Sequence, residues 1–308
     1  MFTIQHHHLE KLCEVHSYPV PSDGMIFFGI RGCLPVDVFN HDFLAQQSLN
    51  LTTVDFTSPR CTLGQWLPSK QMLAVFPGST SPHKSYTSAG ATSANQLMTG
   101  YYNDYRKGTH KAGKPTGHLA FRQTKGCPVR RDHNQDMNYD ELDDRVEYNF
   151  PLDNLHAGWC SGISDTSHAS AGCQVIVGYP QCEKRGSEPD AGPWQVFRTN
   201  AYELPQDRFP YVLSEGQNIQ EVAQKMEAGI KIPARLRFGS DGPLVTELQK
   251  ALQTKGFYEG EVDTDFGNRT LRAVLAFQES AFGKDQDNGI VGLVAAEALG
   301  LKSVWPEF

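Results

Sequence analysis

Two segments of this chain carry a histidine and a cysteine that could together perform acyl transfer. His156 lies in Leu155-His156-Ala157-Gly158, and Cys173 follows seventeen positions later in Ser170-Ala171-Gly172-Cys173. A thiol needs a base or a positive neighbour to become a thiolate near neutral pH, so cysteine catalysis depends on a placed imidazole. Gly172 favours this chemistry as well, because a residue without a side chain lets the backbone pass close to a substrate. The pattern is typical of a nucleophilic cysteine with a histidine in reach.

Zinc binding is a competing chemistry for the same stretch, because imidazole and thiolate groups coordinate zinc at about 2.0–2.3 Å. No two candidate ligands have the tight Cys-x-x-Cys spacing, so the sequence favours catalysis, and we expect neither a metal nor a cofactor. A buried core thiol is a third alternative for Cys173, since cysteine is often buried. The candidate zinc ligands are His156, Cys160, His168, Cys173 and Cys182.

The number of cysteines leaves the redox state open. The chain has seven, so at least one stays unpaired if the others form disulfides. Three disulfides with one free nucleophile fit this count, and so do seven reduced thiols. A disulfide between Cys160 and Cys182, on either side of the Cys173 loop, is a better use of these two sulfurs than a zinc site.

The elements that position the pair are predicted to be strands. From residue 1 to about residue 210 the chain has short apolar runs broken by Gly, Pro, Ser and Asn, a pattern typical of a sheet-rich domain. Helices in this part are expected to be few and short, at 42–50 and 94–105. The predicted strands are 25–30, 72–76, 118–122, 175–177 and 194–197.

The hydrophobic period changes to 3.6 residues in the last third of the chain. Residues 214–228 are helix-like and 229–237 resemble a linker, after which Val245, Leu248 and Leu252 share one helical face. Pro243 can start that helix and Gly256 can end it. A second helix is predicted from Asn268 and a third over 291–299. We therefore predict a domain at 1–213, a helix and linker at 214–236, and a three-helix domain at 237–308.

Composition excludes several classes of partner. The 308 residues carry a net charge of −7, which argues against general binding to nucleic acid or to anionic membranes, because both require a basic surface. No stretch approaches the roughly 20 apolar residues of a membrane helix, and the first 20 residues show no signal-peptide core.

The C-terminal residues resemble a peptidoglycan-binding domain. The likeness is carried by Leu248-Gln249, Gly256-Phe257-Tyr258, Phe266-Gly267, Phe277-Gln278 and the Asp/Gly turns, all in order, with Thr264 and Asn288 as departures. The resemblance implies peptidoglycan as the ligand, and a helical bundle for protein contacts is the alternative. The residues expected to offer aromatic faces and hydrogen bonds to a sugar or peptide are Phe257, Tyr258, Asp263 and Phe266.

The His156 and Cys173 motif resembles the L,D-transpeptidase catalytic domain, which implies a mainly β, β-sandwich fold. In that family the cysteine attacks the peptide bond after the third residue of the peptidoglycan stem and forms a thioester. Carried over by position, Cys173 is the nucleophile and His156 its base. Ser170 supports the loop, and Gly172 with the Cys173 N–H shapes the oxyanion site. Ala171 and Gln174 depart from the family pattern, which leaves the acyl acceptor open.

A candidate substrate-binding segment lies upstream at 101–110, where aromatic and basic residues are mixed. Tyr105 can stack on a sugar, Arg106 can pair with a carboxylate, and His110 belongs to the same run. A solvated turn is the alternative interpretation of this stretch. Arg185 and Arg198 are further candidates for holding a substrate carboxylate.

Together these features predict an enzyme that modifies peptidoglycan stem peptides in the periplasm or cell wall, as an L,D-transpeptidase, carboxypeptidase or endopeptidase. Without a signal peptide, delivery would require a dedicated secretion system, as for an antibacterial effector with an immunity protein, or release at phage lysis. The main alternative is a non-catalytic wall-binding, phage structural or lysis protein. A third is an intracellular thiol enzyme acting on an unrelated peptide.

Overall fold

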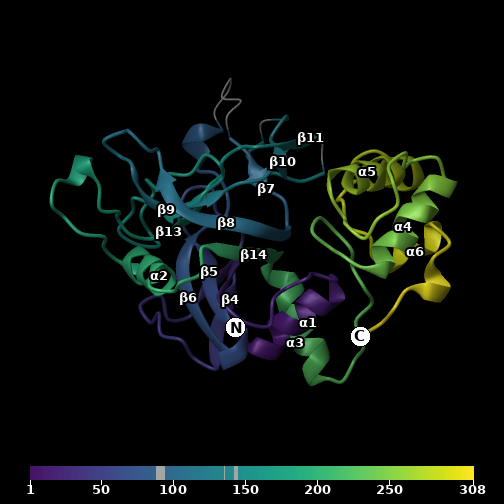
Figure 1. The fold of residues 1–308 in the computed structure, drawn as a ribbon, viewed down its shortest axis with the longest axis horizontal. Coiled ribbons are helices and arrows are strands. Elements are labelled where there is room, and N and C mark those ends of the chain that lie inside the picture. The colour runs from purple at the N-terminus through teal and green to yellow at the C-terminus, as the bar shows by residue number, and fades with distance from the viewer. Residues whose placement is uncertain (88–93, 135, 142–144) are drawn as a thin grey trace.

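The structure is a computed structural model that describes residues 1–87, 94–134, 136–141 and 145–308. Figure 1 shows a strand-rich body on one side and the helices α4, α5 and α6 on the other. None of the helices in these ranges combines the length and the apolar character needed to span a bilayer.

Eight strands of the body form a closed barrel in the order β12-β13-β6-β5-β2-β14-β8-β9. Closure occurs where Leu155 of β12 pairs with Phe121 of β9, and the pairs β12–β13 and β14–β2 are parallel. The mainly β prediction is confirmed, whereas the sheet closes on itself instead of forming the expected sandwich. The strands are β2 (Ile26–Arg31), β5 (Cys61–Leu67), β6 (Met72–Ser79), β8 (Gly100–His110), β9 (His118–Gln123), β12 (Leu155–Ala157), β13 (Gln174–Ile176) and β14 (Arg208–Glu215).

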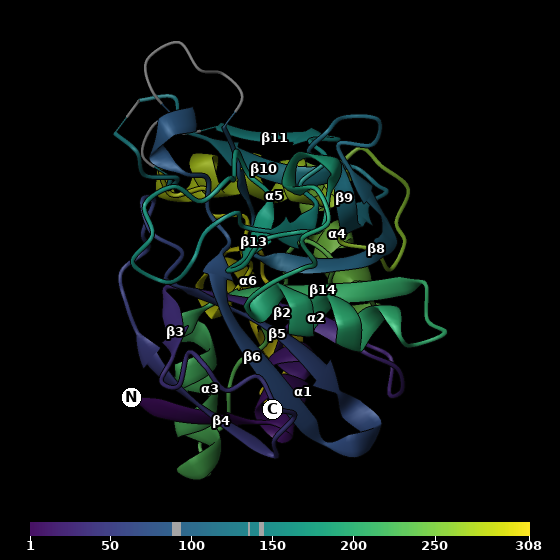
Figure 2. The same cartoon turned by 90° about the vertical axis from the view of Figure 1, so that its left-hand side faces the viewer.

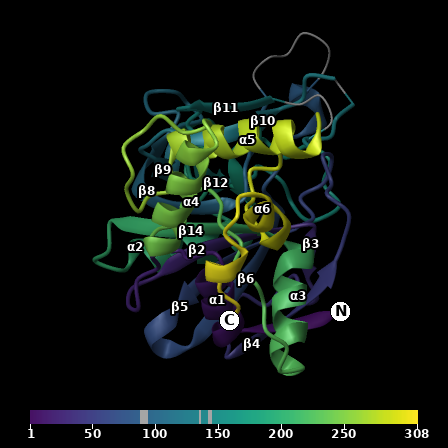
Figure 3. The same ribbon diagram turned by 90° about the vertical axis from the view of Figure 1, so that its right-hand side faces the viewer.

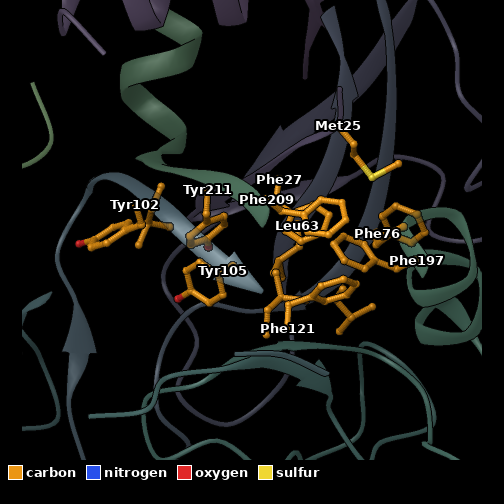
Figure 4. Close-up of a cluster of buried hydrophobic side chains, with 14 of the residues drawn as sticks. Met25, Phe27, Leu63, Phe76, Tyr102, Tyr105, Phe121, Phe197, Phe209 and Tyr211 are labelled. Atoms are coloured by element: carbon orange, nitrogen blue, oxygen red, sulfur yellow. The ribbon is translucent and has the colours of Figure 1, made fainter. Parts of the chain in front are cut away.

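Aromatic side chains fill the barrel, which gives the closed sheet its core. Phe27 stacks on Phe209 at 4.6 Å between ring centroids, and Phe121 meets Phe27 edge-on at 4.7 Å, as Figure 4 shows. An eight-stranded barrel has an interior just wide enough for such side chains. On the other face of the sheet, Gly64 of β5 leaves room for Phe28, because a Cβ there would lie 2.0 Å from the Phe28 ring.

Two small sheets and three helices cover the barrel (Figure 2). One sheet has the order β1-β4-β3 and the other β11-β10-β7. Helices α1 and α3 share a second apolar core, to which Leu12 and Ile219 contribute. The elements are β1 (Phe2–Gln5), β3 (Cys33–Pro35), β4 (Gln46–Leu51), β7 (Gln96–Leu97), β10 (Cys127–Arg131), β11 (Arg145–Asn149), α1 (His6–Val15), α2 (Pro193–Tyr202) and α3 (Gly216–Glu227), with short 3-10 turns at Pro68–Lys70, Lys84–Tyr86, Glu183–Arg185 and Lys302–Val304.

Four of the predicted strands are confirmed as β2, β6, β9 and β13, but three other segments differ from the prediction. The expected helix at 42–50 contains β4, in which burial alternates along the strand, with Gln47 and Leu49 inward. The expected helix at 94–105 is β7 and most of β8, whose tyrosines pack into the body. The expected strand at 194–197 belongs to α2, where Trp194, Phe197 and Ala201 recur at helical spacing.

The predicted three-helix module is confirmed by α4 (Pro243–Thr254), α5 (Asn268–Phe282) and α6 (Leu293–Ala298), seen face-on in Figure 3. Leu248, Leu252, Val274 and Phe277 are buried in its own core. Helix α3 confirms the helix expected at 214–228.

The segment between α3 and α4 is docked along its length instead of hanging free as a linker. Ile232 and Phe308 exchange two backbone hydrogen bonds of 2.9 Å, and Trp305 Nε1 donates to Ala234 O at 2.8 Å. Tyr101 N of β8 donates to Phe238 O, and Asp241 N donates to Ser17 O. The module is therefore hydrogen-bonded to both the chain end and the strand-rich body.

Candidate functional site

Parallel pairing of β12 with β13 brings the two halves of the His-Cys motif together. Leu155 lies opposite Gln174 and His156 opposite Val175, so Cys173, just before β13, lies beside the start of β12. One ligand atom each of His110, His156 and Cys173 lies within 4.8 Å of the others. The structure thus brings the predicted pair together and adds His110, the last residue of β8.

The hydrogen bonds of His156 define which ring nitrogen is free. Nδ1 lies 2.8 Å from the carbonyl of Ala157, which can only accept, so Nδ1 carries the proton. Nε2 is buried, and no described residue offers it a hydrogen-bond partner. Burial, with His110 and His118 nearby, holds the pKa of His156 well below its usual value. The ring is therefore neutral, with an unused lone pair at Nε2.

His110 lies flat against His156, with ring centroids 4.0 Å apart and an interplanar angle of 15°. The amide nitrogen of Asn154 donates to His110 Nδ1 at 3.0 Å, so the neutral ring keeps its proton at Nε2. Burial, followed by His118 and Lys111, lowers the pKa of His110 to about 4. His110 can therefore donate a hydrogen bond from its Nε2, whereas His156 can accept one at its Nε2.

The loop that carries Cys173 is held by hydrogen bonds on both sides. Ser170 Oγ donates to Cys173 O at 2.8 Å and accepts from Gly172 N at 3.2 Å. Asn95 N donates to Ala171 O at 3.0 Å. Gly172 has φ +153°, and a Cβ there would lie 2.7 Å from Asp153 Oδ1. The loop-supporting place predicted for Ser170 agrees with these contacts, while the Gly172 N–H is turned to Ser170 and not to a substrate.

Electrostatics around Cys173 favour the neutral thiol. Burial, then the charge of Asp153, raises the pKa of Cys173 well above its usual value, while the backbone N–H groups of Asn154 and Cys173 itself act in the opposite direction. The sulfur lies 3.8 Å from the carbonyl oxygen of Leu152. Nucleophilic attack from this site would begin with proton transfer from the thiol.

Asp153 is a part of this site that the sequence interpretation missed. It is 3 % exposed and packs behind Gly172, and the side chain of Asn95 hydrogen-bonds to it. Burial raises its pKa to about 7, although Asn95 and Arg131 oppose the shift. Its place three residues before His156 gives no signal in the sequence, because its burial results from the packing of distant strands.

A pocket of about 340 Å³ opens onto the sulfur. Its positive charges come from Lys111 and Lys184, and Lys184 Nζ lies 5.8 Å from the centre of the Trp159 ring. The residues that line it are Tyr86, His110, Lys111, Thr116, His118, His156, Trp159, Ala169, Ala171, Cys173 and Lys184.

Of the predicted substrate residues, only His110 lines this pocket within the described part of the chain. Tyr105 is fully buried, and its hydroxyl donates to Asp153 O at 2.9 Å. Arg106 lies on β8 opposite Arg208, away from the pocket lining. Arg185 pairs with Glu188 at 2.6 Å, and Arg198 pairs with Asp190.

Two imidazoles and a thiol form a donor set that suits zinc or a similar ion. Of the zinc ligands considered from the sequence, His156 and Cys173 belong to this group, together with His110. His168 bonds to Thr57 O and stacks edge-on against His83 instead. All seven cysteines are free thiols, so the expected Cys160–Cys182 disulfide is wrong.

The C-terminal module has a separate groove of about 500 Å³. Phe257 and Tyr258 line it, as does the pair Arg269 and Arg272 on α5. The other two predicted ligand-binding residues have internal contacts. Phe266 is fully buried, and Asp263 Oδ1 accepts from Gln249 Nε2 at 2.7 Å.

Comparison with known proteins bears on this module. Residues 241–299 match the family model described as "Putative peptidoglycan binding domain". A search of curated proteins and a search of solved structures gave no match to the chain. The matched residues include α4, α5, α6 and the groove-lining aromatics. The chain therefore carries a C-terminal peptidoglycan-binding domain at residues 241–299, which implies action at the cell wall.

Proposed function

We propose that this protein is a cysteine enzyme that modifies peptidoglycan stem peptides through a thioester acyl-enzyme, the reaction class of L,D-transpeptidases. The observation that carries the proposal is the meeting of Cys173, His156 and His110 within 4.8 Å at a pocket, in a chain with a peptidoglycan-binding domain. A nucleophile beside a base whose other nitrogen is fixed by a hydrogen bond is the arrangement that covalent catalysis requires.

The proposed reaction begins when the Cys173 thiol gives its proton to the free Nε2 of His156. The sulfur attacks the carbonyl carbon of a stem-peptide bond, forming a C–S bond and a tetrahedral oxyanion. As the oxyanion collapses, the C–N bond breaks and the amine leaves with the proton from His156. An amine or water then attacks the thioester, releasing the acyl group and restoring the thiol.

Donors for the oxyanion lie beside the sulfur. The backbone N–H of Cys173 lies beside its own sulfur, and the neutral His110 carries a proton at Nε2, whereas the N–H of Asn154 already donates to Leu152 O at 2.8 Å. Donors fixed in a buried site stabilise developing negative charge without reorganisation. Lys111 and Lys184 provide positive charge for a stem-peptide carboxylate at the pocket.

The C-terminal groove supports the choice of polymer. Phe257 offers aromatic surface, Tyr258 packs beneath the groove with its ring mostly buried, and Arg269 and Arg272 offer positive charge. When two weak sites act on one polymer, binding at the first raises the effective concentration at the second. The groove would hold the wall while the pocket takes one stem peptide.

The test is mass spectrometry of isolated sacculi after incubation with the full chain. We expect new cross-links, shortened tetrapeptides or cleaved dimers, which report transpeptidase, carboxypeptidase and endopeptidase activity respectively. Cys173→Ala should abolish these products, whereas Cys182→Ala, a buried thiol outside the pocket lining of the described residues, should retain them. Products that persist in Cys173→Ala would contradict the proposal.

Delivery to the wall as an antibacterial effector, with an immunity protein in the producer, is part of this proposal, and release at phage lysis is its alternative. We expect the chain to be toxic to a bacterial host when an export signal is added and harmless when it is confined to the cytoplasm. Equal toxicity of Cys173→Ala and wild type after export would argue against an enzymatic effector.

A non-catalytic wall-binding or phage structural protein is the second candidate function. The raised pKa of Cys173 favours it, because a neutral thiol is a weak nucleophile. That function predicts binding of sacculi by wild type and by Cys173→Ala alike, with no change in the muropeptides from either. The mass-spectrometric comparison therefore separates the two functions.

A further inference from the structure

A second cavity, of about 410 Å³, lies between the strand-rich body and the C-terminal region. Arg31, at the end of β2, and Arg130, on β10, contribute from the body. Arg235 and Arg237 contribute from the docked segment between α3 and α4. Four arginines and three glutamates line this cavity, which leaves one positive charge in excess.

Arg237 carries the excess charge. It is 5 % exposed, and no carboxylate of a described residue lies within 4.0 Å of its guanidinium. Its Nη1 donates to Thr99 Oγ1 at 2.9 Å, while its Nε is buried and has no acceptor among the described residues. The other three arginines have partners: Arg31 with Glu215 at 3.2 Å, Arg130 with Glu141 at 3.5 Å and Arg235 with Glu221 at 2.7 Å.

A buried charge without a counter-ion destabilises a protein unless something compensates it. Arg31 Nε is a second buried donor in the same cavity for which the described residues provide no acceptor. We infer that this cavity binds a small carboxylate ligand, whose oxygens accept from Arg237. Bidentate pairing with a carboxylate is the interaction for which a guanidinium is best shaped.

The charge balance favours a carboxylate over a phosphate. A phosphate group bears a charge of about −1.5 to −2 at neutral pH. The single excess positive charge of the cavity would not neutralise it, and the three glutamates would repel it. Gln96, Gln217, Asn218 and Asn288 also line the cavity and can pair with amide groups. The volume lies within the usual range of about 300–1,000 Å³ for ligand sites, so the ligand class is a small peptide or amino acid with a free carboxylate.

The test uses the full chain and three probes, measured by isothermal titration calorimetry: the dipeptide Ala-Ala, its C-terminal amide and inorganic phosphate. We expect Ala-Ala to bind at least tenfold more tightly than the amide or phosphate. Arg237→Met should abolish that preference, and Arg208→Met, at an exposed arginine of β14, should keep it. Equal binding of acid and amide, tighter binding of phosphate, or no binding of any probe would each overturn the inference.

Thermal unfolding distinguishes a ligand-binding role of Arg237 from a structural role. Because Arg237→Met removes an unpaired buried charge and keeps the length of the side chain, we expect its melting temperature to equal or exceed that of ligand-free wild type. Ala-Ala should raise the melting temperature of wild type and leave that of Arg237→Met unchanged. A lower melting temperature of the variant, with no shift of wild type by Ala-Ala, would mean that Arg237 is structural and would overturn the inference.

Discussion

Asp153 makes the stability of this protein depend on pH in a direction opposite to that of most carboxyl groups. Burial raises its folded-state pKa from 3.8 to about 7. Between these two values the folded state therefore binds more protons than the unfolded state. The contribution of Asp153 to stability is fully present below pH 4 and is lost as the pH rises toward 7.

The magnitude follows from the shift. One pKa unit corresponds to about 1.4 kcal/mol, so ionisation of Asp153 between pH 5 and pH 8 costs wild type about 3 kcal/mol in unfolding free energy. Asp153→Asn keeps the shape of the neutral carboxyl and does not ionise. From pH 5 to pH 8, wild type should therefore lose about 3 kcal/mol of unfolding free energy relative to Asp153→Asn.

Urea unfolding at pH 5, 6, 7 and 8 measures this difference, and subtraction of wild type from the variant cancels the histidines, which both proteins share. Asp207→Asn, at an exposed aspartate, is the matched control and should show a difference that does not change with pH. If Asp153→Asn also gave a constant difference over this range, Asp153 would not be held protonated by burial and the reasoning would fail.

Four further predictions concern the pocket and the groove. Because ionised Asp153 raises the pKa of Cys173, iodoacetamide should alkylate this thiol faster at pH 8 in Asp153→Asn than in wild type. An unchanged rate would show that the charge of Asp153 does not act on Cys173. Gly172→Ala should lose about 1–3 kcal/mol in urea unfolding, since its methyl would lie 2.7 Å from Asp153 Oδ1, while Gly162→Ala, which has open space, should be near neutral. Phe257→Ala should weaken co-sedimentation with sacculi severalfold while Cys173→Ala does not. Prolonged dialysis against EDTA should leave muropeptide products unchanged and added Zn²⁺ should suppress them; loss of products with EDTA would assign the His-Cys donor set to a metal.

The parts of the structure that could be predicted depend on short-range signals. The three C-terminal helices follow from a 3.6-residue apolar period. His156 meets Cys173 because β12, which contains His156, pairs with β13, which begins directly after Cys173. Segment 42–50 is predicted as a short helix, whereas pairing with β1 and β3 makes its second half the strand β4. For segment 194–197, three large side chains in a short run resembled a strand, although they belong to a longer helical period.

The other parts of the site depend on contacts between distant positions. His110 reaches Cys173 only because β8 pairs with β9 and β9 with β12 around the closed barrel. Asp153 becomes buried only when the loop at Asn95 packs over it. The charge of Arg106 predicts a place at the substrate, but a strand directs neighbouring side chains to opposite faces. Arg185 and Arg198 pair with Glu188 and Asp190 instead.

The docked segment between α3 and α4 has a geometrical consequence for the proposed reaction on a polymer. Ile232 and Ala234 are hydrogen-bonded to the end of the chain, so the groove at Phe257 is not carried on a flexible tether. Its distance from Cys173 is then constant within one molecule. A wall-bound copy would modify stem peptides at one fixed offset along the glycan from its point of attachment, and the modified positions would recur at a regular interval where copies lie side by side.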